Sequence, residues 1–341
     1  MVTGKYQFFY DQMPENHLRL FYTKALQAAQ QRESTFVIPS HAAGKISFSN
    51  ALLYLFGDHP ELFDLNIGHL NTWRTLSNQW KIQLFYRESG ESAAQREVNF
   101  CNAVEQILCK CFPNGWQHLS PLMREKLIFN YIADHIAYDH EALQNSRTTP
   151  GWSSQSSDAW SAYGALVKKK AVCQGVACAF KLLCDQVDIP SLVVIGTVLS
   201  VNERHAWNMV RIDGHFYHVD CTWMLRTEIN TQIPYRRYKY FNIPDQMFQG
   251  ERTMEMDYLP KCRSLRHNPF FIRKLCVRNA GEATDLLAKQ LEEGNSRFAI
   301  LCVGFSMTKD ECASIMTRVT SLTGKRVQWY LEEHFLGGYT V

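Results

Sequence analysis

The chain has 341 residues, of which 46% are hydrophobic and 20% charged, and its formal net charge is +3. This composition is typical of a globular protein with two or three folded units, and it excludes extended disorder. The low net charge gives no reason to expect a nucleic-acid partner, and no stretch of about 20 apolar residues predicts a membrane span. No signal-peptide pattern opens the sequence, so we expect a cytoplasmic location.

The eleven cysteines are irregularly spaced and odd in number, which favours free thiols in a reducing compartment. Cys101, Cys109 and Cys111 lie close together in sequence and raise the alternative of a metal site. They lack a second ligand pair at zinc-like spacing, so we expect neither a metal nor a cofactor.

Three regions are expected: an N-terminal α+β region over residues 1–96, a central domain over 97–262 and a small C-terminal α/β domain over 263–341. Apolar spacing together with helix start and stop signals predicts the first elements. They are a helix over 18–29, a turn at 58–63 that enters a short helix, a strand over 82–86, and helices over 97–111 and from 121 to about 136.

Residues 145–161 are rich in Ser, Thr, Pro and Gly and predict a surface loop. The alternative is a flap beside a substrate cleft, with Trp152 or Trp160 at the border of that cleft.

Residues 171–175 are predicted to open a helix that ends at 188–190, with apolar residues at helical spacing and with Cys173 in or just before the first turn. A cysteine in a first helical turn lies beside free backbone N–H groups, which lower its pKa and can form part of an oxyanion hole. A cysteine on an apolar helix face is more often a core residue, and we assign Cys178 and Cys184 to that role.

A buried strand over 192–197 is followed by two strand-like runs that flank Asp213-Gly214, a pair typical of a two-residue hairpin turn. The resulting register places His205 and Asp220 on one face, within reach of a side-chain hydrogen bond. Cys173, His205 and Asp220 are therefore the predicted nucleophile, base and orienting carboxylate. His218 shares this face and is a rival base, whereas His215 projects to the opposite face.

Beyond residue 268 the pattern alternates between short strands and helices, which predicts the small α/β domain. Strands are expected over 272–277, 298–303 and 327–331, and helices over 282–291 and 310–322.

Four motifs resemble the transglutaminase-like superfamily, and especially its bacterial members, in order and spacing. They are SAYGALV at 161–167, AVCQG at 171–175, RHAWN at 204–208 and YHVDCTW at 217–223, and YFNIPD at 240–245 is similar to the same group. The resemblance implies a papain-like α+β core, in which the Cys173 helix packs on an antiparallel sheet that bears His205 and Asp220. It makes residues 97–262 a transglutaminase-like catalytic domain.

Members of this superfamily include protein cross-linkers, deamidases, cysteine peptidases, peptide N-glycanases and inactive scaffolds. The chain departs from its bacterial relatives at Trp160, where they often have His, and at Met224, where they tend to have Asp. Neither departure removes a member of the predicted triad.

These patterns predict acyl transfer on protein or peptide amides through a Cys173 thioester. Hydrolysis by a peptidase or deamidase comes first because water needs no acceptor site; a cross-linking transglutaminase and a non-catalytic protein-binding module are the alternatives. Tyr163, Gln174 and Trp207 are candidate oxyanion or substrate contacts. Core packing is the alternative for Tyr163, and a hydrogen bond at the helix start is the alternative for Gln174.

Overall fold

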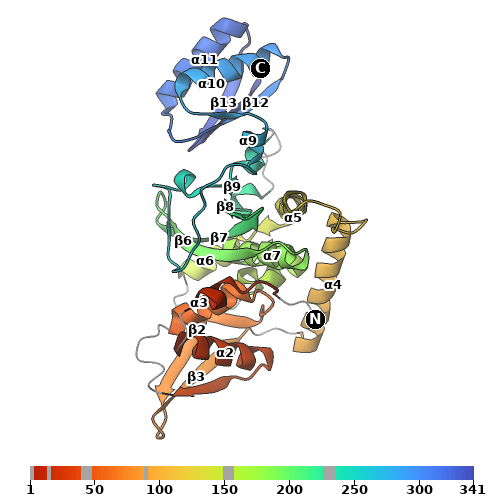
Figure 1. Ribbon diagram of the computed structural model, residues 1–341, viewed down its shortest axis with the longest axis vertical. Coiled ribbons are helices and arrows are strands. Elements are labelled where there is room, and N and C mark those ends of the chain that lie inside the picture. The colour runs from red at the N-terminus through yellow and green to blue at the C-terminus, as the bar shows by residue number, and fades with distance from the viewer. Residues whose placement is uncertain are drawn as a thin grey trace.

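The computed structural model describes residues 4–13, 17–39, 48–87, 91–148, 157–225, 233 and 235–341. Three parts follow one another along the long axis of the molecule, from the N-terminal part (red and orange in Figure 1) through the central sheet (green) to the C-terminal part (blue). The α+β class expected from the sequence is confirmed, since helices accompany a mainly antiparallel sheet in each part.

The N-terminal part contains a three-stranded antiparallel sheet with the strand order β1-β3-β2. Its elements are α1 (Phe8–Gln12), α2 (His17–Gln30), β1 (Thr35–Pro39), α3 (Phe48–Asp58), β2 (Leu65–Arg74) and β3 (Gln79–Tyr86). The helix predicted after the 58–63 turn is wrong, because α3 ends at Asp58 and turns follow it. The Asp58 carboxylate accepts the backbone N–H groups of Phe9 (3.1 Å) and Tyr10 (2.9 Å), so it caps another segment instead.

The central part contains a five-stranded antiparallel sheet with the order β10-β6-β7-β8-β9. Its longer elements are α4 (Ala93–Cys111), α5 (Pro121–His135), α7 (Cys173–Gln186), β6 (Ser191–Val198), β7 (Glu203–Ile212) and β8 (His215–Val219). The predicted helices and strands here are confirmed, and α4 begins four residues earlier than predicted. Helix α7 packs on β6 and β7, and Asn208 of β7 fixes the contact by donating to the Ala177 carbonyl at 2.9 Å.

Short elements connect these. They are β4 (Ala137–Tyr138), α6 (His140–Thr148), η3 (Asp158–Trp160), η4 (Gly164–Lys168), β5 (Lys170–Ala171), η5 (Thr222–Met224), η6 (Arg236–Tyr238), β9 (Phe241–Ile243), η7 (Asp245–Met247) and β10 (Arg252–Met254). The predicted loop over 145–161 is therefore helical up to Thr148 and again from Asp158. Trp152 lies outside the described residues, and Trp160 is half-buried.

The C-terminal part has a four-stranded sheet with the order β11-β12-β14-β13 and its own hydrophobic cluster. Its elements are α9 (Pro269–Ile272), β11 (Cys276–Val277), α10 (Ala280–Glu292), β12 (Arg297–Cys302), α11 (Lys309–Thr323), β13 (Val327–Glu332) and β14 (Phe335–Thr340). The strand predicted over 272–277 is wrong at its start, because the Asn268 side chain caps α9 through the N–H groups of Phe270 and Phe271. Strand β14 was not predicted, since Gly337-Gly338 weakens its strand pattern.

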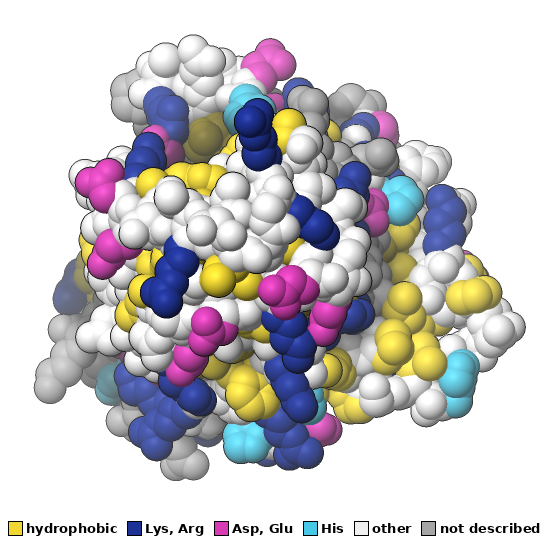
Figure 2. All heavy atoms as spheres, turned by 90° about the horizontal axis from the view of Figure 1, so that it is seen from above, with side chains coloured by type: hydrophobic (Ala, Val, Ile, Leu, Met, Phe, Trp, Pro, Cys, Tyr) yellow, Lys and Arg dark blue, Asp and Glu magenta, His cyan; other side chains and the backbone are white. Residues whose placement is uncertain are grey.

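Within the described residues, no helix is long and apolar enough to cross a membrane. Figure 2 shows Lys and Arg side chains interspersed with Asp and Glu on the face that it presents. The N-terminal and central parts share one hydrophobic cluster, and the domain boundaries at 96 and 262 stay predictions.

Candidate active site

Cys173 is the first residue of α7, and Val172 is the N-cap. Backbone N–H groups of a first helical turn lack an intrahelical partner, so they can stabilise negative charge on a sulfur or on a nearby oxygen. Gly175 allows this turn to approach residues 159–161, because a Cβ there would lie 2.4 Å from the Ala159 carbonyl oxygen. Cys173 is buried, with 7% of the residue exposed.

The β7–β8 hairpin has the register that the sequence predicts. Asp213 and Gly214 both have positive φ, at 47° and 82°, as a two-residue type I′ turn requires. Ile212 consequently pairs with His215, and Met209 pairs with His218. Because side chains alternate along each strand, this register decides which of them face α7.

The hairpin brings His205 and Asp220 into contact. His205 Nε2 donates to Asp220 Oδ2 at 2.7 Å, and Arg252 Nη1 donates to the same oxygen at 2.6 Å. The other carboxylate oxygen accepts the backbone N–H groups of Thr222 (3.0 Å) and Trp223 (3.3 Å). Asp220 is fully buried, and these four donors hold it as an ionised and immobile carboxylate.

Burial opposes charge on each of the three residues, and their partners reverse this effect. Burial would raise the pKa of Asp220, but His205 and Arg252 hold that pKa well below its usual range. Burial would lower the pKa of His205, but Asp220 and Cys173 raise it to about 9. Burial would raise the pKa of Cys173, but the His205 hydrogen bond and charge and the Ala206 N–H lower it. These shifts favour a thiolate–imidazolium pair at neutral pH.

Cys178 and Cys184 lie further along α7 and have the core role expected of them. Both are fully buried, and burial raises the pKa of each thiol well above its ordinary value. They therefore differ from Cys173 in charge state, although all three belong to one helix.

A cleft of about 430 Å³ lies beside His205, and Tyr138 is among its lining residues. The parallel pairing of β4 with β5 sets Tyr138 opposite Ala171, two residues before Cys173. Burial raises the pKa of Tyr138, the charge of Cys173 raises it further, and a hydrogen bond from the Cys173 backbone lowers it. Tyr138 was not singled out from the sequence, because a two-residue strand carries no readable period.

The three candidate contact residues do not line this cleft. Tyr163 is fully buried and its hydroxyl donates to Glu91 at 2.9 Å. Gln174 donates from Nε2 to the Trp160 carbonyl at 3.0 Å, which is a hydrogen bond at the helix start. Trp207 is fully buried beside His205, with ring centroids 6.0 Å apart. Their burial favours a structural role, in which they hold neighbouring residues of the site in place. A role in oxyanion or substrate contact stays a prediction.

The rival base His218 has other partners. Its Nδ1 accepts the indole N–H of Trp207 at 3.0 Å, and its Nε2 lies 2.9 Å from Asp245 Oδ1. Burial lowers the pKa of His218 in spite of Asp245, so this imidazole is neutral at pH 7 with its proton on Nε2. His215 is exposed, as predicted from the opposite face.

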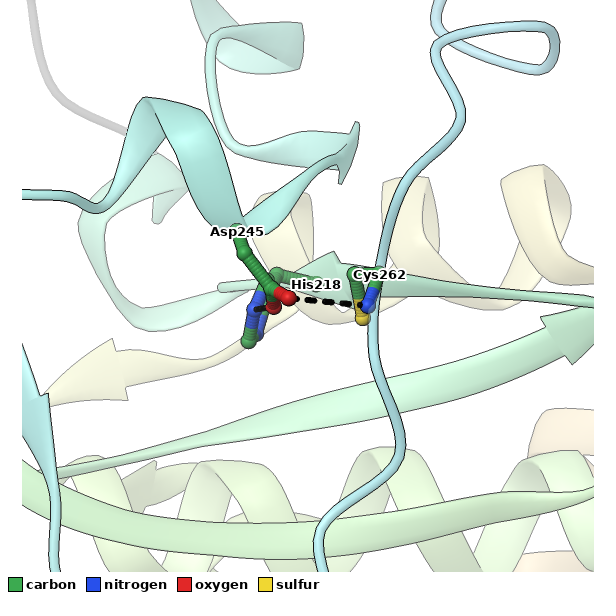
Figure 3. Close-up of side chains that lie close together, drawn as sticks. All are labelled: His218, Asp245 and Cys262. Carbon is green, nitrogen blue, oxygen red and sulfur yellow. Dashed lines mark hydrogen bonds and ion pairs between the residues drawn. The ribbon is translucent and has the colours of Figure 1, made fainter.

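His218, Asp245 and Cys262 form a group of possible metal ligands within the described part of the chain, and their ligand atoms lie within 4.8 Å of one another (Figure 3). A metal-bound imidazole carries its proton on the far nitrogen and donates that proton to an acceptor. Here the far nitrogen, Nδ1, faces the Trp207 N–H, which is a donor. The Cys262 backbone N–H also donates to Asp245 at 3.2 Å, so the group fits a hydrogen-bonded brace behind Trp207 better than a metal site.

Residues 115–221 match the model of the transglutaminase-like superfamily. A solved structure described as a TGase is similar over 52% of this chain and 48% of its own, with 15% identity and a TM-score of 0.34. A candidate cysteine protease from Cytophaga hutchinsonii is similar over 46% of this chain and 62% of its own, with 12% identity and a TM-score of 0.25. The chain thus spans about half of the first protein and less than two thirds of the second. No curated protein matches significantly.

Proposed function

We propose that this protein, whose core belongs to the transglutaminase-like superfamily, transfers the acyl group of a protein or peptide amide to water through a thioester on Cys173. The observation that carries the proposal is the position of the His205 imidazole, which is hydrogen-bonded to Asp220 at 2.7 Å and also to the Cys173 side chain. A thiolate at a helix start with an oriented imidazolium beside it is an activated nucleophile.

The first half of the reaction forms the thioester. Because Asp220 occupies Nε2 of His205, the other nitrogen, Nδ1, is the one that takes the Cys173 proton. The thiolate attacks the amide carbonyl carbon, and the N–H groups at the start of α7 stabilise the oxyanion. His205 then gives its proton to the departing amine as the C–N bond breaks, which leaves an acyl–sulfur bond.

The second half restores the enzyme. Neutral His205 takes a proton from water, and the resulting hydroxide attacks the thioester carbonyl. The C–S bond breaks, the carboxylic acid leaves, and the thiolate–imidazolium pair forms again. An amine in place of water would give an isopeptide bond, which is the transglutaminase reaction. Hydrolysis is the proposed outcome because it needs no acceptor site beyond the cleft beside His205.

The nucleophile is tested by alkylation with iodoacetamide at pH 6–7 and mass spectrometry of each cysteine. Cys173 is expected to react much faster than Cys178 and Cys184, which share its helix but are fully buried and have raised pKa values. Equal rates would reject the activated thiolate, and would favour a binding module on the same fold.

The acceptor is tested with casein as an amide substrate, with and without a dansylated amine, and with Cys173→Ala as the control. Release of peptides that requires Cys173 supports hydrolysis, as does release of ammonium that requires Cys173 and is not accompanied by cross-linked casein. Incorporation of the dansylated amine that requires Cys173 would instead make the protein a transglutaminase and overturn the hydrolytic proposal.

A further inference from the structure

The turn of the β13–β14 hairpin, residues 332–334, lies against the central part of the protein. Glu332 pairs with Arg236, and Glu333 Oε2 accepts from Lys239 Nζ at 2.7 Å and from the Tyr240 hydroxyl. His334 Nε2 lies 2.8 Å from Glu251 Oε1. Three consecutive residues of the C-terminal hairpin thus contact residues 236–240 and Glu251, the residue that precedes Arg252 and β10.

Arg252 connects this contact to the active site. Its side chain is 2% exposed, and Nη1 donates to Asp220 Oδ2 at 2.6 Å, on the oxygen that also receives His205. The guanidinium lies over four aromatic rings that leave it little freedom to move. The distances to the ring centroids are 4.2 Å for Phe248, 4.7 Å for Tyr240 and 5.4 Å for both Trp207 and Trp223.

Three of these rings also touch the catalytic residues or the hairpin turn, and Trp207 is the one that stacks on His205 at 6.0 Å. Trp223 lies edge-on to His205 at 6.1 Å and to Tyr240 at 5.9 Å. The Tyr240 hydroxyl donates to Glu333. A continuous path of packed groups therefore runs from the turn of the C-terminal hairpin through Tyr240 and Arg252 to Asp220.

We propose that Arg252 is a positioning residue that sets the pH window of the triad, and that the turn of the C-terminal hairpin holds Arg252 in place. The proposal rests on the proposed function, since it concerns the same thiolate–imidazolium pair. It gives the C-terminal part, which has no catalytic motif of its own, a role in the reaction.

The sign of the effect follows from charge. Arg252 offsets the negative charge of Asp220, and that negative charge destabilises the Cys173 thiolate while it stabilises the His205 imidazolium. Without Arg252, more of the Asp220 charge acts on both partners, so the pKa of Cys173 and the pKa of His205 both rise. If Arg252 acted only by packing, its loss would loosen the site and weaken the ion pair between Cys173 and His205. The pKa of Cys173 would then rise and the pKa of His205 would fall, so that the two values move toward each other.

The titratable groups around this charge are few. Those that interact with the Arg252 guanidinium are Asp220, His218 and Tyr240, and Tyr240 in turn interacts with Glu251 and Glu333. Asp220 itself faces His205 and Arg252, and its charge also acts on the thiols of Cys173 and Cys221. None of the others is placed to replace the hydrogen bond from Arg252 to Asp220.

The test measures the rate of Cys173 alkylation by iodoacetate between pH 4 and 10. In the resulting pH–rate profile, the rise on the acid side (the acid limb) reports formation of the thiolate. The fall on the alkaline side (the alkaline limb) reports loss of the imidazolium, which attracts this anionic reagent. Arg252→Met is expected to move both limbs upward by about one pH unit, as expected for a unit charge several ångströms away. Arg252→Lys keeps the charge and is expected to leave both limbs in place while the rate falls, because Lys lacks the planar fork.

The hairpin contact is tested in the same assay with Glu333→Gln, and Glu293→Gln is the matched control. Glu293 belongs to the same part of the chain and forms an exposed ion pair with Lys289. We expect a several-fold slower alkylation for Glu333→Gln and no change for the control. Equal rates for the two variants would overturn the role of the hairpin.

Each result has one meaning. Limbs that converge in Arg252→Met, or that do not move, overturn the charge role of Arg252. If this variant does not fold, Arg252→Gln replaces it, since Gln keeps hydrogen-bond donors without the charge, and the same upward movement is expected. Slow alkylation of Cys173 in the unmodified protein would instead reject the proposed function, so the two failures are distinguishable.

Discussion

Asp220→Asn tests the electrostatic basis of the site most directly. The substitution keeps the size of the side chain and removes the negative charge that faces His205 Nε2 at 2.7 Å. Burial lowers the pKa of His205, but Asp220, with a smaller contribution from Cys173, raises it from 6.5 to about 9. Each pKa unit corresponds to about 1.4 kcal/mol, so Asp220 and Cys173 together stabilise the imidazolium by roughly 3.5 kcal/mol. Asp220 also raises the pKa of Cys173, so its loss partly favours the thiolate. We therefore expect the reactive ion pair, and the alkylation rate of Cys173 at pH 7, to fall by up to roughly 300-fold.

Arg252 complicates this experiment, because Asp220→Asn leaves its guanidinium buried without a counter-charge. Removing one partner of a buried pair costs about 3–5 kcal/mol of folding free energy. The double variant Asp220→Asn/Arg252→Met removes both charges. It is expected to recover much of the lost stability without recovering the reactivity of Cys173.

The assay combines the second-order rate of iodoacetamide labelling at Cys173 with urea unfolding of the same samples. Loss of reactivity in both variants, with stability restored only in the double variant, separates the catalytic effect from the folding effect. A folded Asp220→Asn protein that labels within a few-fold of the wild-type rate would refute the role of this carboxylate.

Two further predictions concern other buried groups. Burial raises the pKa of Glu125 to about 8, above its unfolded value of about 4.3, so wild-type stability falls as the pH rises between these values. The Gln side chain of Glu125→Gln can still accept the hydrogen bond from Asn242, which is 2.9 Å long in the wild type. In urea unfolding, the free energy of unfolding of the variant relative to the wild type should rise by about 1.4 kcal/mol per pH unit from pH 5 to 8. A difference that does not change with pH would contradict a buried neutral carboxyl. Zn²⁺ should not change the melting temperature, because the Trp207 N–H holds the proton of His218 on Nε2; a zinc-induced rise that Cys262→Ser abolishes would overturn this tautomer.

The part of the site that the sequence predicts depends on contacts that are close along the chain. The Asp213-Gly214 turn fixes the hairpin register, and strict alternation of side chains carries that register to His205 and Asp220. The start of α7 is equally local, since it follows from apolar spacing after Val172. Short-range rules are sufficient wherever one turn or one helix sets the geometry.

The same rules do not give the surroundings of a side chain. Tyr163 and Trp207 occupy positions next to the catalytic motifs, which favoured contact with substrate. The hydroxyl of Tyr163 instead reaches Glu91, 72 residues earlier, and the indole of Trp207 reaches His218 on the neighbouring strand. Apolar periodicity predicts that such rings are buried, but the partner of their polar atom is decided by tertiary packing.

Arg252 shows the limit most clearly. Once Asp220 is placed in a buried sheet, the rule that buried charges are paired requires a cation near it. His205 alone does not meet this need, because it becomes neutral when it gives up its proton. The chain offers 36 Lys and Arg residues. The one selected lies in the three-residue edge strand β10, which pairs with β6 and sets Arg252 opposite Val198. In sequence, such a residue has the pattern of an exposed strand. The selection is made by the aromatic rings around the guanidinium and by the C-terminal hairpin behind Tyr240, which are brought together only when the three parts of the chain have packed.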